Sequence, residues 1–209
     1  MKKEIAVFDI SKEEVSQATE TLIAAFEEDA FIQCVCGVGV DSIEARRVFF
    51  SAVINYCRLY GRAYRTENFE SVGCRLLPAE TQLNFWRMLR SGMLKIRGCL
   101  GKDRFNNLMK ISDEQNVIVK KYLADTEYLY CWVLGTHPDK QRQGFGGAIM
   151  RKTFNLARSL NVPCYLETFT ESVISAHKHN GYVELTSHSF EDLGLSMHCM
   201  LNDVKSTDN

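Results

Sequence analysis

Residues 139–150 read DKQRQGFGGAIM, and they join a strongly apolar segment, YLYCWVL at residues 128–134, to a segment with helical periodicity. A strand, a glycine-rich loop and the start of a helix direct several unpaired backbone N–H groups to one place, where the helix dipole is positive. Glycines let ligand oxygens approach the backbone closely, so this arrangement is typical of phosphate-binding sites. The sequence therefore predicts that this junction binds a phosphate group.

Two other phosphate-binding motifs fit this junction poorly. A P-loop ends in Gly-Lys-Ser or Gly-Lys-Thr, whereas residues 146–148 read GGA. The dinucleotide-binding motif G-x-G-x-x-G follows its strand directly, but about nine residues separate the apolar segment from Gly144, and Ile149 occupies the third glycine position. One feature does favour a dinucleotide, because Glu167 lies near the position of the acid that binds ribose.

A third motif matches. Residues 141–146, QRQGFG, have the form Q/R-x-x-G-x-G/A after a predicted strand and at the start of a predicted helix. In this motif the chain resembles the GCN5-related N-acetyltransferase (GNAT) superfamily, which holds the pyrophosphate of acetyl-CoA at such a loop. HKHNGY at residues 177–182 resembles the closing motif Y-x-x-x-G-F/Y of the same superfamily.

Two further segments resemble one branch of the superfamily, the small acetyltransferases that include puromycin N-acetyltransferase. AFEED at residues 25–29 is similar to that branch's AF-x-x-D-P, with Ala30 in place of the proline. PCYLET at residues 163–168 is similar to its P-x-Y-L-E-T. The resemblance spans nearly the whole chain, and its specific motifs lie within residues 128–182.

The resemblance implies an α/β (α+β) GNAT fold with a mixed central sheet of about six to seven strands and helices on both faces. It also implies a splay between the strand before the glycine loop and the following parallel strand. Chain length predicts one domain, residues 1–209. Hydrophobic periodicity predicts strands and helices in the order β-α-β-α-β-β after a helical insert at about 81–123. The main predicted helices are residues 11–30, 42–61, 104–122 and 148–161, and a hairpin is predicted around Asn68.

Composition limits the partners and the location of the chain. A formal net charge of −1 argues against a nucleic-acid partner. No apolar run approaches the roughly 20 residues that span a bilayer, and no signal peptide is evident, so we expect a cytoplasmic protein without a membrane partner. The eight scattered cysteines are typical of buried free thiols, and no metal site is predicted. The chain is expected to be a monomer or a homodimer.

The resemblance to the superfamily implies that acetyl-CoA would lie along one strand edge and the glycine loop. The backbone of Leu134 and Thr136 would hydrogen-bond the pantetheine arm, and the loop N–H groups would hold the pyrophosphate. The expected CoA-binding residues are Leu134, Thr136, Gln141, Arg142, Gln143, Gly144, Phe145, Gly146 and Gly147.

Acetyl transfer also needs a neutral amine, and deprotonating a lysine-like amine at neutral pH costs about 4–5 kcal/mol. Some members of the superfamily use a glutamate in the strand before the loop, but Tyr130 occupies the matching position here. Glu167, at the end of the neighbouring strand, is the candidate base. The alternative is a structural carboxylate that accepts backbone N–H groups at the splay.

The leaving thiolate is usually protonated by the tyrosine of the closing motif, where this chain has His177. A histidinium with a pKa near 6.5 would serve as the acid. Tyr130 or Tyr165 would be a substitute, or the thiolate would take its proton from water.

The acceptor amine is expected to bind beside the end of the first helix. Glu28 and Asp29 would form an acidic rim there, and Phe31 an apolar wall, although a solvated helix end is the alternative. Phe85 and Trp86 of the insert would extend the wall or belong to the core.

These features predict an acetyl-CoA-dependent N-acetyltransferase that acetylates a primary amine of a small molecule or peptide by direct transfer in a ternary complex. The alternatives are a non-catalytic acyl-CoA-binding or interaction module and, less favoured, an NAD(P)-binding oxidoreductase.

Overall fold

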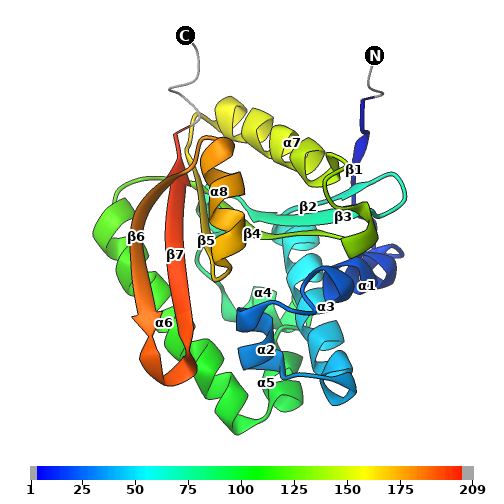
Figure 1. Ribbon diagram of the computed structural model, residues 1–209, viewed down its shortest axis with the longest axis vertical. Helices are drawn as coiled ribbons and strands as arrows, with labels where there is room; N and C mark the ends of the chain where they lie inside the picture. The colour runs from blue at the N-terminus through cyan, green and yellow to red at the C-terminus, as the bar shows by residue number, and fades with distance from the viewer. Residues whose placement is uncertain (1–3, 204–209) are drawn as a thin grey trace.

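A mixed sheet of seven strands runs through the computed structural model, which describes residues 4–203 (Figure 1). The strand order is β1-β2-β3-β4-β5-β7-β6, and among the described strands only β4 and β5 pair in parallel. The strands are β1 (Val7–Asp9), β2 (Gly61–Thr66), β3 (Ser71–Leu76), β4 (Leu129–Thr136), β5 (Cys164–Thr168), β6 (Val183–Phe190) and β7 (Leu195–Asn202). The expected mixed α/β sheet is confirmed, and a dinucleotide-binding fold is excluded because it needs a mostly parallel sheet.

Helices cover both faces of the sheet, with α7 and α8 on one face and α1 and α3 on the other (Figure 1). The helices are α1 (Val15–Ala25), α2 (Ala30–Cys36), α3 (Ile43–Tyr60), α4 (Phe85–Ser91), α5 (Leu94–Leu100), α6 (Lys102–Leu123), α7 (Phe145–Leu160) and α8 (Glu171–His179). The predicted helical insert is thus α4 to α6. Within residues 4–203, no helix is both long and apolar enough to cross a membrane.

The first predicted helix, residues 11–30, is wrong in its bounds, because α1 covers only Val15–Ala25 and a second helix begins at Ala30. The Ser11 N–H donates to the Glu14 carboxylate (2.8 Å), which is one half of a capping box, but the Ser11 hydroxyl donates to Glu13 and α1 begins only at Val15. After a turn, Asp29 caps α2 by accepting the N–H of Ile32 at 3.0 Å. The chain therefore turns at the acidic residues that the sequence placed at a helix end.

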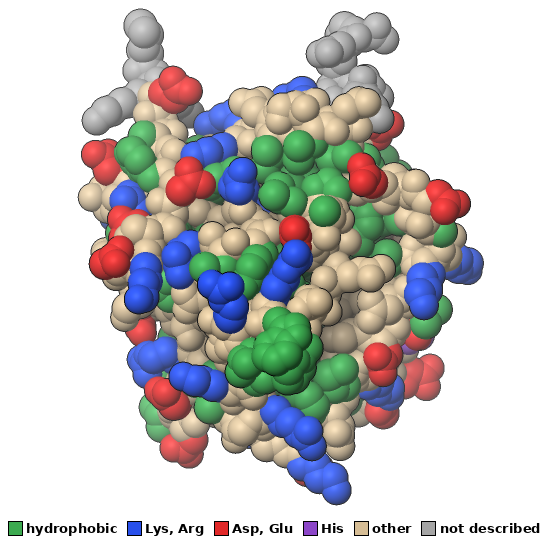
Figure 2. Space-filling view, turned by 180° about the vertical axis from the view of Figure 1, so that it is seen from behind, with side chains coloured by type: hydrophobic (Ala, Val, Ile, Leu, Met, Phe, Trp, Pro, Cys, Tyr) green, Lys and Arg blue, Asp and Glu red, His purple; other side chains and the backbone are tan. Residues whose placement is uncertain are grey.

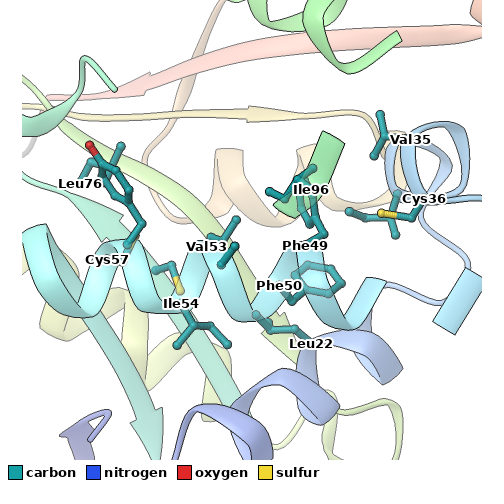
Figure 3. Packing of buried hydrophobic residues seen from close by; sticks show 14 of the residues in the cluster. Leu22, Val35, Cys36, Phe49, Phe50, Val53, Ile54, Cys57, Leu76 and Ile96 are labelled. Atoms are coloured by element: carbon teal, nitrogen blue, oxygen red, sulfur yellow. The ribbon is translucent and has the colours of Figure 1, made fainter. Parts of the chain in front are cut away.

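The larger core lies between the sheet and α1 and α3 (Figure 3). Phe50, Val53 and Ile54 of α3 are fully buried, at the spacing that puts them on one helix face. Gly135 lets α1 lie directly on β4, since an added Cβ would be 2.8 Å from side-chain atoms of Leu22 and Ala25. This contact places the end of α1 beside the strand that leads to the glycine loop.

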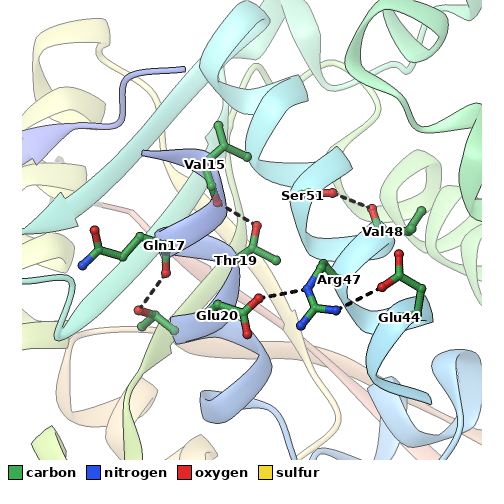
Figure 4. Close-up of polar contacts among 9 residues, drawn as sticks. Val15, Gln17, Thr19, Glu20, Glu44, Arg47, Val48 and Ser51 are labelled. Carbon is green, nitrogen blue, oxygen red and sulfur yellow. Dashed lines mark hydrogen bonds and ion pairs between the residues drawn. The ribbon is translucent and has the colours of Figure 1, made fainter. Parts of the chain in front are cut away.

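On the outer side of the same pair of helices, one ion pair joins α1 to α3, and a second lies within α3 (Figure 4). Arg47 of α3 contacts Glu20 of α1 and Glu44, each at 3.0 Å. All three side chains are exposed, so these pairs contribute at most about 1 kcal/mol each. Core packing therefore dominates the attachment of α1.

All eight cysteines are free thiols. Six are buried, as the sequence predicted, whereas Cys34 is half-buried and Cys99 is exposed because it lies on the outer side of α5. Among residues 4–203, no group of three or more histidine, cysteine or acidic side chains is arranged to hold a metal ion.

Candidate active site

The two parallel strands part at the centre of the sheet. β4 and β5 pair only at Leu129 with Cys164 and at Tyr130 with Tyr165, although β4 continues to Thr136. The predicted splay is therefore present. Seven consecutive apolar residues, 128–134, would be expected in a strand buried on both faces, but only Leu129 and Cys131 are buried and the other five residues are half-buried.

Both predicted pantetheine-binding residues of β4 lie on the parted stretch. Leu134 pairs with Gly73, and Thr136 with Ser71, so β3 occupies only one edge of the strand there. The edge facing β5 has no strand partner within the described residues. Backbone groups on this edge are available to an extended ligand that fills the gap.

The glycine loop ends at the start of α7, close to this gap. Gly144 is the N-cap residue with φ +93°, a left-handed conformation that glycine adopts without strain, and Arg142 also has a positive φ of 59°. The first helical hydrogen bond of α7 is donated by the N–H of Ala148 to the carbonyl of Gly144 (3.0 Å). The preceding N–H groups, from Phe145 to Gly147, therefore have no helical acceptor.

The loop has room for an anion. Gln141, Arg142 and Gln143 are exposed, and Gln143 turns its amide back to donate to the carbonyl of Asp139 at 3.1 Å. At Gly146 the space is tight, because an added Cβ would lie 3.0 Å from the Thr136 hydroxyl. Free N–H groups at a helix start suit an anion such as phosphate, and a larger residue at Gly146 would meet the Thr136 hydroxyl.

A β-bulge at Trp132 determines which side chains face the gap. Cys131 opposes Arg75 on β3, but Val133 opposes the adjacent Cys74, so Trp132 is the extra residue. Tyr130 and Trp132 lie on the α3 side of the sheet, as residues two apart in a strand do, with ring centroids 6.2 Å apart, and the bulge adds Val133 to the same side. Side chains of β4 alternate between the two faces of the sheet before the bulge and after it, but not across it.

Glu167 lies on the same side as these rings. It is half-buried beside Tyr130 and Tyr165, whose ring centroids are 6.0 Å apart. Burial raises the pKa of Glu167 to about 7, against an opposing effect of the two tyrosine hydroxyls, which stabilise its charged form. The Tyr165 hydroxyl is buried without a hydrogen bond of ordinary geometry in the described chain. The structure thus brings the predicted base and the predicted substitutes for the acid together.

His177 lies across the sheet from Glu167. Its ring, on α8, contacts Tyr182 edge-on at a centroid distance of 5.6 Å, within the smaller core between the sheet and α7 and α8. Burial, followed by the positive charge of Arg75, lowers the pKa of His177 to about 4. The expected histidinium is therefore wrong, and the ring is neutral at pH 7.

Arg75 was not identified from the sequence as a site residue. It is fully buried, and its guanidinium donates to the carbonyl of Val133 at 2.7 Å and to the Thr153 hydroxyl at 3.0 Å, with no carboxylate partner in residues 4–203. It lies opposite Cys131, whose Sγ is 3.4 Å from the Tyr182 hydroxyl. The only available signal was a basic residue inside an apolar strand pattern.

The predicted acceptor rim meets the end of β5. The rings of Phe31 and Phe169 stack with centroids 4.8 Å apart, and Asp29 Oδ2 accepts the Thr170 hydroxyl at 3.0 Å. Because Asp29 Oδ1 also caps α2, both of its oxygens serve the structure. Glu28 is exposed and has no partner among the described residues.

The insert does not continue this wall with its aromatic residues. Phe85 and Trp86 are mostly exposed, so they belong neither to the core nor to a closed acceptor pocket, contrary to both expectations. A half-buried Phe105 instead packs under Arg97, whose guanidinium lies 5.5 Å from the ring centroid.

Comparisons with known proteins match this fold to acetyltransferases. No family model and no curated protein matches the chain. A histone acetyltransferase HPA2 and related acetyltransferase from Corynebacterium glutamicum superposes with a TM-score of 0.64 at 14% identity, over 95% of this chain and 96% of that one. Drosophila melanogaster polyamine N-acetyltransferase, which forms N-acetylagmatine, gives 0.65 at 13%, over 94% and 98%. Arylalkylamine N-acetyltransferase 2 from Aedes aegypti gives 0.58 at 12%, over 97% and 100%. At these identities the likeness shows the fold.

Proposed function

We propose that this chain, which has the fold of the GNAT acetyltransferases, is an acetyl-CoA-dependent N-acetyltransferase acting on a primary amine of a small molecule or peptide. The observation that carries the proposal is the open edge of β4 next to the free N–H groups of the glycine loop at α7. The acceptors named for the solved neighbours, agmatine and arylalkylamines, support an amine substrate. The segments at residues 25–29 and 163–168 support a place near the puromycin N-acetyltransferase branch.

Binding of the donor would use two parts of the chain. The backbone of Leu134 and Thr136 would hydrogen-bond the pantetheine arm along the open edge, and the N–H groups from Arg142 to Gly147 would hold the pyrophosphate. A bound acetyl-CoA supplies the thioester carbon that the amine attacks. Holding both reactants in line can supply up to about 7–11 kcal/mol of the barrier.

Glu167 would take the proton of the amine, directly or through a water molecule. With a pKa of about 7, roughly half of this carboxyl group is ionised at neutral pH, which suits a general base. Tyr130 and Tyr165 hold it on the α3 side of the sheet, where Phe31 and Phe169 border the end of β5. An amine that reaches the gap from this side meets the base first.

The group that assists the leaving sulfur would lie on the α7 and α8 side of the sheet. Because His177 is neutral at pH 7, its role is that of a neutral hydrogen-bond donor rather than a charged acid. Tyr130 is the alternative donor, although burial and then the nearby Glu167 carboxylate raise its pKa and make it a weak acid.

A melting experiment tests donor binding. CoA at about 100 times its dissociation constant should stabilise the chain by about 2.7 kcal/mol, whereas NAD should not. Gly146→Val should abolish the CoA shift, because the added Cβ meets the Thr136 hydroxyl at 3.0 Å. Gly98→Ala is the matched control, since its Cβ would enter open space. An equal shift by NAD, or a full CoA shift in Gly146→Val, would refute the assigned site.

One observation favours a second candidate, a non-catalytic acyl-CoA-binding module. Tyr130 occupies the place of the familiar base, and His177 is uncharged at neutral pH. Such a module would bind CoA and leave every amine unmodified. For both candidate functions we propose a cytoplasmic location, because eight free thiols suit a reducing compartment.

A further inference from the structure

The insert carries a strongly asymmetric charge. Between Glu80 and Asp103 the chain has no acidic residue, yet residues 81–102 contain five lysines and arginines. The whole chain has a formal net charge of −1. The five positive charges are therefore concentrated in about one-tenth of the sequence. This concentration of charge is independent of the proposed catalytic function.

The same stretch exposes large apolar side chains. Phe85, Trp86 and Leu89, at positions i, i+1 and i+4 of α4, are 59%, 69% and 49% exposed. Leu83 and Leu94 flank them at 44% and 39%. Figure 2 shows an apolar prominence in the middle of one face with lysine and arginine side chains around it. We call these five residues, Leu83, Phe85, Trp86, Leu89 and Leu94, the α4 patch.

Several of the neighbouring cations have no acidic partner. Arg90 and Lys95 are exposed, and neither forms an ion pair with any residue that the structure describes. By contrast, Arg87 pairs with Glu80 and lies over the ring of Tyr60, which anchors α4 to α3. The patch thus combines a fixed helix, a projecting indole and free positive charges.

We propose that the α4 patch binds the surface of an anionic lipid bilayer. Tryptophan and phenylalanine beside leucines insert favourably at the boundary between headgroups and acyl chains, and nearby cations are attracted to anionic headgroups. A soluble monomer rarely exposes so many contiguous apolar side chains without a partner. The contact is peripheral. The sequence-based expectation of no membrane partner rested on the lack of a spanning segment, which does not bear on surface binding.

Two other occupants fit less well. A second copy of the chain in a two-fold dimer would bring the same unpaired cations, such as Arg90 and Lys95, against one another. A single-stranded nucleic acid would use the aromatic rings for stacking, but it would leave Leu83, Leu89 and Leu94 without an apolar partner. A bilayer accommodates both the aliphatic and the charged residues.

Cosedimentation with vesicles tests the proposal. The chain should bind vesicles of phosphatidylcholine mixed with phosphatidylserine, bind phosphatidylcholine alone more weakly, and lose affinity as salt rises. The double variant Arg90→Gln, Lys95→Gln should weaken binding by about 30-fold, at about fivefold per cation. Phe85→Ala with Trp86→Ala should reduce binding to both kinds of vesicle.

Matched controls remove equivalent groups elsewhere. Lys12→Gln with Lys120→Gln removes two exposed, unpaired cations, and Val183→Ser removes an exposed apolar side chain from β6. These variants should bind as the unmodified chain does, and circular dichroism melts should show that every variant is folded. The proposal is overturned by absent binding to phosphatidylserine vesicles, by equal losses in control and patch variants, or by patch-dependent dimerisation or RNA binding without vesicle binding.

Discussion

Glu167 combines two properties that suit a general base. It is half-buried beside tyrosine rings, and it lies at the end of a strand that borders an opening in the sheet. Sequence placed Glu167 at this strand end. It could not supply the pKa, because the burial of Glu167 beside Tyr130 and Tyr165 depends on how β4 and β5 pair in the folded chain.

A first prediction concerns the rate. Glu167→Gln should lower kcat by about 10²–10⁴-fold while the affinity for CoA stays within error, because the amide cannot accept the amine proton. In the unmodified chain kcat should rise with pH to a plateau above about 7, the pKa of the carboxyl group. Steady-state kinetics of both proteins from about pH 5.5 to 9 measure kcat on either side of the Glu167 pKa. A variant with normal kcat, or with the same rising limb, would remove Glu167 from the mechanism.

The same substitution has a consequence for stability. The pKa of Glu167 is raised by folding, so the native state binds the proton more tightly than the unfolded state does. Its contribution to stability is then fully present below the unfolded pKa of about 4.5 and is lost as pH rises through about 7. Urea unfolding at pH 5 and pH 8 should show Glu167→Gln gaining stability relative to the unmodified chain at the higher pH. An unchanged difference between the two proteins would show that the carboxyl group is not desolvated.

His177 leads to a different prediction. His177→Ala should lower turnover more than it weakens CoA binding, since the ring is assigned to the leaving sulfur. Because its pKa is about 4, its ionisation should produce no limb in the pH profile between 5 and 8. Saturating kinetics and CoA titration of the variant separate the two effects. Equal losses in both, or no loss of turnover, would argue for a packing role against Tyr182.

At the scale of elements, the sequence predicted most helices and strands but not how they join. The Ser11 N–H donates to the Glu14 carboxylate, yet α1 starts only at Val15 and ends at a turn, because Asp29 caps a new helix. The bulge at Trp132 had no sequence signal, since it depends on how β3 and β4 pair rather than on alternation. Buried Arg75 was also missed, because its hydrogen-bond partners are carbonyls that only the pairing of β3 and β4 brings to it.

Packing of α1 on β4 gives a prediction at this scale. Gly135→Ala should destabilise the chain by about 1–3 kcal/mol, because the added Cβ would lie 2.8 Å from atoms of Leu22 and Ala25. Gly98→Ala in α5 should instead stabilise it by about 0.5–1 kcal/mol, since its Cβ meets open space in a helix. Denaturant titrations compare the two. A neutral Gly135→Ala would mean that α1 moves away from β4 without cost.

At the scale of the whole molecule, the resemblance to the GNAT superfamily predicted the sheet. It implied a mixed sheet with a splay, and β4 and β5 do part after two residue pairs. The two faces of the sheet then separate the chemistry, with Glu167 on the α3 side and His177 on the α7 and α8 side. The acceptor was not predictable to the same degree, because the loops that border it contact each other only in the folded chain, as Phe31 and Phe169 do.

The central claim is that this chain transfers an acetyl group from CoA to an amine. Purified protein should be incubated with acetyl-CoA and a panel of primary amines that includes agmatine, polyamines and arylalkylamines, and the products followed by mass spectrometry alongside release of the CoA thiol. We predict an acetylated amine and an equal amount of free CoA, with both greatly reduced in Glu167→Gln. Binding of CoA without acetylation of any amine would contradict the account and identify a non-catalytic module.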